Sequence, residues 1–216
     1  MVLRGHQQAE LVHMNEMTLL EEIKQSTNLH RIPNKIHVSK DILLDYRLLQ
    51  ALDNPEPGKD LVYDFDIYMP TYGINLQRPY VWEAFQQREF IMSVLLEKPL
   101  ENVVIVKKLA NYMNRGDEVN LVIDGKQRLL SIQKFAHDEF PIIINGREVY
   151  WRDFDDESRM YFRNRVNYMT ATVYYSYPDC EVTDEMLVIL FNYYNFSGTP
   201  QTEAHKRMLQ SLVNNT

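Results

Sequence analysis

The feature that most constrains this chain is an apolar run that passes directly into a charged, helix-forming segment. Residues 119–123 (VNLVI) are typical of a buried strand, and residues 125–135 (GKQRLLSIQKF) have apolar positions at helical spacing. Between them, Gly125 permits a tight turn or a close approach of the backbone. This unit predicts a domain in which strands and helices are mixed.

Charged side chains are concentrated at this predicted strand–helix junction. Lys126 and Arg128 would place positive charge at the helix N-terminus, which is unfavourable for the helix dipole unless an anion is present. The free N–H groups of a helix start favour such an anion, and an arginine can donate two hydrogen bonds to phosphate oxygens. Asp124 could bind a divalent metal, orient a water or cap the helix. The junction therefore suggests a phosphate site, although the sequence contains no Walker-type phosphate loop.

A second interpretation of the junction needs no ligand. Asp124 would then be only the N-cap of the helix, and the side chains of Lys126 and Arg128 would point to solvent. The residues alone leave both interpretations open.

Another arginine stands among aromatic residues in residues 77–82 (QRPYVW). Arg78 precedes a proline, so its backbone is expected to be extended, and Tyr80 and Trp82 follow it. Arg78 is either a second arginine that contacts phosphate or a structural arginine packed on an aromatic ring. Neither role is favoured by the residues themselves.

A polar turn between two helices is expected in residues 191–200 (FNYYNFSGTP). A structural explanation covers two positions of this turn: Gly198 would end one helix, and Thr199 would begin the next. Asn195 is left open by this explanation, so it is a further candidate for function.

The remaining sequence predicts an α+β chain with a small sheet. The prolines and glycine of residues 54–60 (NPEPGKD) cannot continue a helix, so the best boundary separates an N-terminal helical extension, residues 1–58, from a domain over residues 59–216. Residues 62–73 are expected to be extended, and Asn145-Gly146 predicts a hairpin turn. Helices are expected over 11–26, 41–52, 82–96 (with apolar positions at Phe85, Phe90, Ile91, Val94 and Leu95), 156–165, 184–195 (capped by Thr183) and from Thr199 onward. Further strands are expected over 102–107 and 170–176.

Composition and charge limit the classes of function. The formal net charge is −7, which argues against a protein whose whole surface binds DNA but leaves room for a local basic groove. Residues 147–165 carry five arginines among five acidic residues, a pattern typical of a charge-balanced, solvated surface. The longest apolar stretches, such as residues 186–191, are too short to span a bilayer, the N-terminus lacks the apolar core of a secretion signal, and one cysteine excludes an intramolecular disulfide. We therefore expect a cytoplasmic protein with no membrane partner.

The three polar segments, taken in order, resemble the GmrSD-type N-terminal domain family, also described as GmrS-like. Members of that family carry a QRxYxW segment, a DGQQR motif that opens a helix, and a later N-x-x-G-T-P-L segment; this chain has QRPYVW, DGKQR and NFSGTP over roughly residues 66–210. The resemblance implies an α+β domain with a ParB/sulfiredoxin-like fold. It also implies nucleotide binding and NTP hydrolysis with Mg²⁺, often in defence against modified phage DNA.

The family's functional positions carry over onto this sequence residue by residue. The matching residues are Gln77, Arg78 and Trp82 in the first motif, Asp124, Gly125, Gln127 and Arg128 in the second, and Asn195, Gly198 and Thr199 in the third. The resemblance implies that Asp124 and Arg128 are catalytic, that Asp124 also binds the metal, and that the other positions bind nucleotide. Lys126 replaces the usual glutamine and adds charge that favours anion binding, while Gln201 replaces the usual leucine.

Restriction members of the family also carry a C-terminal HNH-type nuclease domain. This chain ends soon after the third motif, and its six histidines form no short metal-binding pair, so we expect the nuclease module to be absent. Cleavage of DNA would then need a separate nuclease subunit or the ParB-like domain itself. Alternatives are a non-catalytic nucleotide- or DNA-binding sensor or decoy, and a DNA-acting nuclease or kinase-like DNA-modifying enzyme. The helical N-terminus could serve as a dimerisation arm in a homodimer.

Overall fold

The computed structural model describes residues 37–43, 63–109, 118–177, 180–195 and 207. All of them belong to the second of two units into which the chain divides, residues 32–216. The helices predicted over 11–26 and from Thr199 onward, the boundary loop at 54–60, and Gly198, Thr199 and Gln201 lie outside the described residues. The division of the chain at residue 58 stays a prediction.

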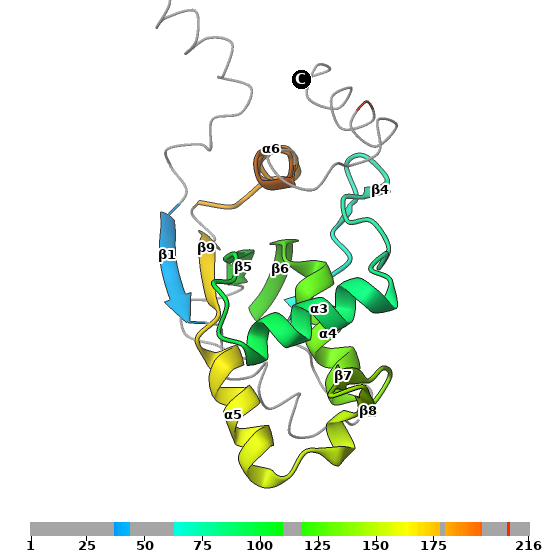
Figure 1. Cartoon of the computed structure of the whole chain (residues 1–216). Coiled ribbons are helices and arrows are strands. Elements are labelled where there is room, and N and C mark those ends of the chain that lie inside the picture. Colours follow the sequence, from blue (N-terminus) through cyan, green and yellow to red (C-terminus); the bar gives the residue numbers. More distant parts are fainter. Residues whose placement is uncertain (1–36, 44–62, 110–117, 178–179, 196–206, 208–216) are drawn as a thin grey trace, which may run out of the picture. The chain divides into compact units, whose positions relative to one another are not determined.

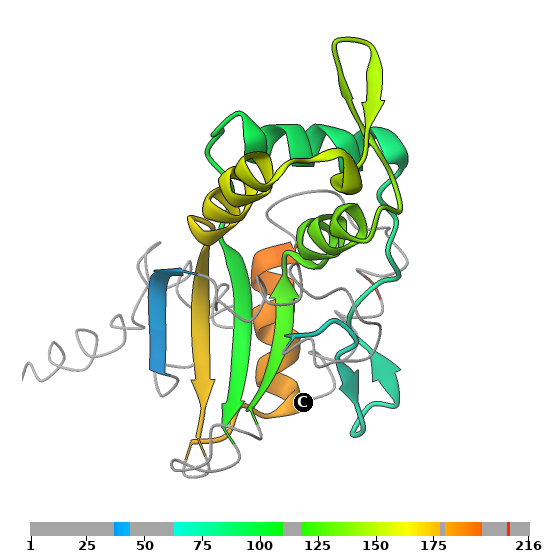
Figure 2. The same ribbon diagram turned by 90° about the horizontal axis from the view of Figure 1, so that it is seen from below.

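A mixed five-stranded sheet forms the centre of the described part, with the strand order β1–β9–β5–β6–β2. Its strands are β1 (His37–Leu43), β2 (Tyr63–Asp64), β5 (Val103–Leu109), β6 (Glu118–Asp124) and β9 (Thr170–Ser176). The pairs β1–β9 and β5–β6 are antiparallel, whereas β9–β5 and β6–β2 are parallel. Figure 2 shows β1, β9, β5 and β6 side by side, from blue through yellow to green.

Four α-helices and two small two-stranded sheets complete the described residues. The helices are α3 (Ala84–Leu95), α4 (Lys126–Ala136), α5 (Asp156–Asn167) and α6 (Asp184–Asn195), and a 3₁₀ helix, η3, spans Trp151–Asp153. The small sheets pair β3 (Tyr68–Met69) with β4 (Ile74–Asn75), and β7 (Ile142–Ile144) with β8 (Arg147–Val149). The predicted α+β class with a small mixed sheet and surrounding helices is confirmed. In the described part of the chain, no helix has the length and apolarity needed to cross a membrane.

Both faces of the sheet are buried, which explains why its central strands read as continuous apolar runs. Successive residues of a strand point to opposite faces. In β5, Val103 and Ile105 pack into one cluster with α3, α4 and α5, while Val104 and Val106 pack into another with α6. Figure 1 shows α6 on one side of the strands and α4 and α5 on the other.

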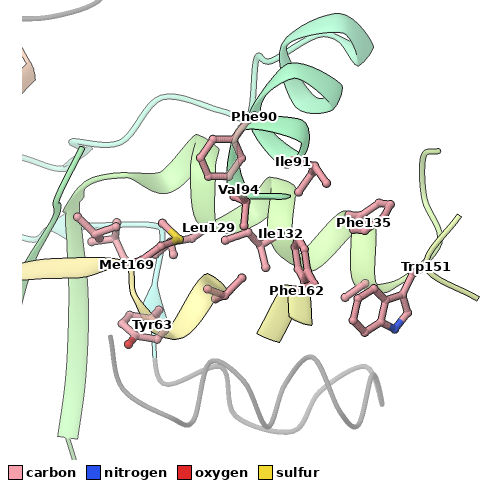
Figure 3. Close-up of a cluster of buried hydrophobic side chains, with 14 of the residues drawn as sticks. Tyr63, Phe90, Ile91, Val94, Leu129, Ile132, Phe135, Trp151, Phe162 and Met169 are labelled. Atoms are coloured by element: carbon pink, nitrogen blue, oxygen red, sulfur yellow. The ribbon is translucent and has the colours of Figure 1, made fainter. Parts of the chain in front are cut away.

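The cluster under α3, α4 and α5 is rich in aromatic rings. Phe135 of α4 is its centre, with ring centroids 5.6 to 5.9 Å from those of its aromatic neighbours Phe140, Trp151, Phe154 and Phe162. Figure 3 shows Leu129, Ile132 and Phe135 of α4 beside residues of α3 and α5. Each such ring pair contributes about 0.5–1.5 kcal/mol beyond the burial of its area. Phe135 lies in the last turn of α4, so these ring pairs hold that end of the helix against η3 and α5.

Local signals predicted several boundaries correctly. The strand over 170–176 matches β9, and the helix over 184–195 matches α6, where the Thr183 Oγ1 accepts a hydrogen bond from the Met186 N–H at 3.4 Å. The predicted hairpin turn is confirmed because Asn145 and Gly146 both have positive φ angles, 51° and 76°.

Two predictions about helices were wrong. Residues 41–43, expected to begin a helix over 41–52, end strand β1, where Ile42 pairs with Ala171 of β9; residues 44–52 lie outside the described part. Pairing with a distant strand overrides local propensity here. Phe85, expected on the apolar stripe of α3, is 71% exposed. It precedes the buried Val94 by about 2.5 helical turns, which places it on the opposite face.

Candidate functional site

A pocket of about 320 Å³ opens where β6 ends and α4 begins. Every predicted site residue that the structure describes lines it: Gln77, Arg78, Trp82, Asp124, Gly125, Lys126, Gln127, Arg128 and Asn195. Residues of α3 and of the segment that follows it, residues 98–101, also line the pocket. A volume of this size is at the lower end of the range for small-molecule sites, about 300–1,000 Å³.

Gly125 is required at this position for two independent reasons. Its φ angle is +106°, a left-handed conformation that other residues rarely adopt. A Cβ atom at Gly125 would also lie 3.0 Å from both Cγ atoms of Val103 on β5. Gly125 is the N-cap residue of α4, while Asp124 is the last residue of β6. The interpretation of Asp124 as only the helix N-cap is therefore wrong.

Arg128 is buried, and its hydrogen bonds hold the start of α4 against the end of β6 and the segment before β5. Only 9% of the residue is exposed, so it does not point to solvent. Its Nη2 donates to the Asp124 Oδ2 at 2.8 Å and to the Asn102 carbonyl at 3.3 Å, and its Nη1 donates to the Glu101 carbonyl. Arg128 thus ties the helix to the end of β6 and to the loop that enters β5.

Lys126 is buried as well, with 7% of the residue exposed. Its Nζ lies 3.2 Å from the Oδ1 of Asp66, which also accepts a hydrogen bond from the Asn75 Nδ2 at 3.1 Å. The hydrogen bond from Asn75 is the main cause that holds the pKa of the Asp66 carboxyl below its usual value, and Lys126 adds to this effect. The second interpretation of the junction, in which Lys126 points to solvent, is therefore wrong.

Two predicted site residues bind the backbone at the end of β6. The Gln77 Nε2 donates to the Ile123 carbonyl at 3.0 Å and also to the Val122 carbonyl. The Asn195 Nδ2 donates to the same Ile123 carbonyl at 3.1 Å and to the Phe191 carbonyl at 3.0 Å. The first and third motifs therefore meet at Ile123, the residue that precedes Asp124. This shared hydrogen-bond acceptor gives Asn195 a structural role at the pocket.

Gln127 joins the second motif to the first. Its Oε1 accepts hydrogen bonds from the backbone N–H groups of Val81 at 2.9 Å and Trp82 at 3.2 Å, and its Nε2 donates to the Pro79 carbonyl at 3.3 Å. Both ends of the carboxamide are thus used to hold the extended segment against α4. This contact fixes the position of the neighbouring Arg78 along the pocket wall.

Asp124 is the carboxylate that the pocket presents at the strand–helix junction. Its side chain is 32% exposed. Burial raises the pKa of the Asp124 carboxyl above its ordinary value; the Arg128 guanidinium and the Gly125 N–H oppose this rise, and the nearby Glu101 reinforces it. Asp124 is therefore a better proton acceptor than an ordinary surface aspartate, and it keeps access to the pocket.

Arg78 is half-buried in the pocket wall, and among the described residues its side chain has no hydrogen-bond or ion-pair partner. It is close enough to Asp124 to lower the pKa of that carboxyl slightly. Beside it, the Trp82 ring lies against Phe90, with centroids 5.5 Å apart in an edge-to-face arrangement. The pocket therefore combines a free cation, a carboxylate and an aromatic wall.

The sequence analysis did not identify Lys98 or Glu101, which also line the pocket. In the sequence, Lys98 and Pro99 follow the helix expected over 82–96 and indicate only that a helix cannot continue there, and Glu101 belongs to no motif. Their place at the site depends on the path of the chain between α3 and β5, which no local sequence pattern predicts.

Comparison with known proteins decides the family. The family model of the GmrSD restriction endonuclease N-terminal domain matches residues 59–211. The chain belongs to this family. The expected membership is confirmed, and it connects the chain with restriction systems. Comparisons with curated proteins and with solved structures gave no match.

Proposed function

We propose that the pocket of this GmrSD-family domain binds a nucleoside triphosphate and hydrolyses it with Mg²⁺, in a restriction or modification system. The observation that carries the proposal is the half-buried Arg78, which has no hydrogen-bond or ion-pair partner among the described residues. It lies beside Asp124, whose pKa is raised, in one pocket with the other described motif residues. A guanidinium without a counter-ion is a ready partner for phosphate oxygens.

The chemistry follows from the positions of three side chains. Arg78 contacts the phosphates, Asp124 orients a water, and Arg128 holds Asp124 in place through the 2.8 Å ion pair. The water oxygen forms a bond to the γ-phosphorus, the bond to the leaving diphosphate oxygen breaks, and Asp124 accepts the proton. Catalysis of phosphoryl transfer consists mainly of such positioning and of electrostatic stabilisation.

The donor groups of the pocket fit a magnesium ion that arrives with the nucleotide. Mg²⁺ is commonly held by one or two carboxylates together with substrate phosphates. Asp124 and Glu101 line the pocket, while the described residues contain no group of three or more acidic, histidine or cysteine side chains gathered as in a dedicated metal site. Asp124, with Glu101, would hold the ion, which neutralises phosphate charge when it is bound.

A sensor that binds nucleotide without hydrolysing it is the second candidate. The ion pair between Asp124 and Arg128 favours it, because a carboxylate engaged by a guanidinium is less free to orient water. In either case the proposed architecture is ParB/sulfiredoxin-like, and a nuclease subunit is a proposed partner.

Phosphate release from each of the four NTPs with Mg²⁺ tests the proposal, with wild type beside Asp124→Asn and Arg78→Ala. The Asp124→Asn side chain keeps an oxygen that can accept the hydrogen bond from Arg128, but a carboxamide cannot act as a base and take the proton of the water. We expect turnover in the wild type. Asp124→Asn should lose turnover but still bind the nucleotide when binding is measured without Mg²⁺, and Arg78→Ala should lose both turnover and binding. Binding without turnover in the wild type would identify the sensor, and wild-type turnover in Asp124→Asn would refute the assigned role.

A further inference from the structure

The four basic side chains that line the pocket differ in how their charge is compensated. Lys126 and Arg128 are 7% and 9% exposed, and each has a carboxylate partner, Asp66 at 3.2 Å and Asp124 at 2.8 Å. Arg128 donates two further hydrogen bonds to backbone carbonyls. The charge of each of these two side chains is therefore already compensated by a carboxylate, and each side chain is largely withdrawn from solvent.

The other two basic side chains are Arg78 and Lys98. Both line the pocket, Arg78 from the extended segment before α3 and Lys98 from the segment after it. Within the described part of the chain, neither side chain has a hydrogen-bond or ion-pair partner. Arg78 is half-buried and Lys98 is exposed, so neither would have to break a contact with another described residue to accept a new partner.

Displacing Arg128 from its partners would be costly. Removing the donor from a buried charge pair leaves the remaining carboxylate and carbonyls unsatisfied, which is strongly unfavourable. A phosphate that instead meets a free guanidinium and a free ammonium gains two charge-assisted contacts without this penalty.

We propose that Arg78 and Lys98 form the anion-binding pair of the pocket, while Lys126 and Arg128 maintain its walls. The inference rests on the proposed function and specifies it: the ligand is a polyphosphate ester whose phosphates lie between the two segments that flank α3. The apolar part of the ligand then lies against the remaining wall, to which Trp82, Phe90 and Leu100 contribute. Lys98 is thus a binding residue outside all three sequence motifs.

Inorganic tripolyphosphate and a fluorescent ATP analogue are suitable probes, because the first has only the anionic part of such a ligand. Affinities of the full chain are measured by calorimetry and by fluorescence titration for wild type, Lys98→Ala, Lys98→Arg and Lys40→Ala. Lys40 is an exposed lysine on β1, at the edge of the sheet away from the pocket, and serves as the matched control. Thermal unfolding checks that each variant folds.

Lys98→Ala should weaken the binding of both probes by about tenfold, as expected for the loss of one charged contact. Lys98→Arg and Lys40→Ala should bind both probes as the wild type does. Wild-type affinity in Lys98→Ala, with binding present in the wild type, would overturn this inference and leave the proposed function intact. Failure of the wild-type protein to bind either probe would overturn both.

Discussion

Replacement of Gly125 by alanine should destabilise the protein through two separable effects. A positive φ angle costs a residue with a Cβ atom about 1–2 kcal/mol. The new Cβ would also meet both Cγ atoms of Val103 at 3.0 Å, and overpacking of this kind costs about 1–3 kcal/mol. The lower conformational entropy of the unfolded variant offsets about 0.4–1 kcal/mol of this cost, so the expected net loss is about 1–5 kcal/mol. Urea denaturation measures it.

Two comparisons test this reasoning. Gly73 has a φ angle of +64° and nothing within 4 Å of an added Cβ, so Gly73→Ala should show only the conformational cost, about 1 kcal/mol. Val103→Ala should cost less in the Gly125→Ala background than in the wild type, because it removes the atoms that clash. Equal losses for the two glycine variants, or no coupling between positions 103 and 125, would refute the steric account.

Two further predictions concern the ion pairs of the junction. Arg128→Ala should lower the free energy of unfolding by about 3 kcal/mol in a denaturant titration, because it leaves Asp124 and two carbonyls without their donor; a loss no larger than that of an exposed ion pair would contradict this. Asn75 and Lys126 lower the pKa of the Asp66 carboxyl in the folded state. The ionised Asp66 therefore contributes its full stabilisation at pH values above the ordinary carboxyl pKa. This stabilisation is lost as the pH falls through the lowered pKa of the folded state. Asp66→Asn should therefore reduce the acid-side loss of stability, and identical pH dependence in variant and wild type would count against the assignment.

The strand–turn–helix unit at the site was predictable because its signals are local. The apolar run before Asp124, the glycine at the turn and the helical spacing after it all lie within neighbouring residues. Strand β1 was not predictable in this way, because residues 41–43 suit a helix or a strand and their pairing partner, β9, lies far along the chain. Only the tertiary pairing decides between the two.

The same distinction applies to the candidate site. The motif residues that the structure describes all line the pocket, but the motifs do not show what the side chains contact. The partner of Lys126 is Asp66, which precedes it by 60 residues, and the ion pairs of Lys126 and Arg128 compensate charge that the sequence assigned to phosphate. Lys98 reaches the pocket through the path of the chain after α3, for which the sequence has no signal.

The central claim, that this pocket binds nucleotide through Arg78, is tested most directly by calorimetric titration of Arg78→Ala with NTP and Mg²⁺. Arg152→Ala is the matched control, because Arg152 is an exposed arginine that does not line the pocket. Removal of one charged contact to phosphate should weaken binding by about 10- to 100-fold in Arg78→Ala and leave Arg152→Ala unchanged. Equal nucleotide affinity in wild type and Arg78→Ala would contradict the claim.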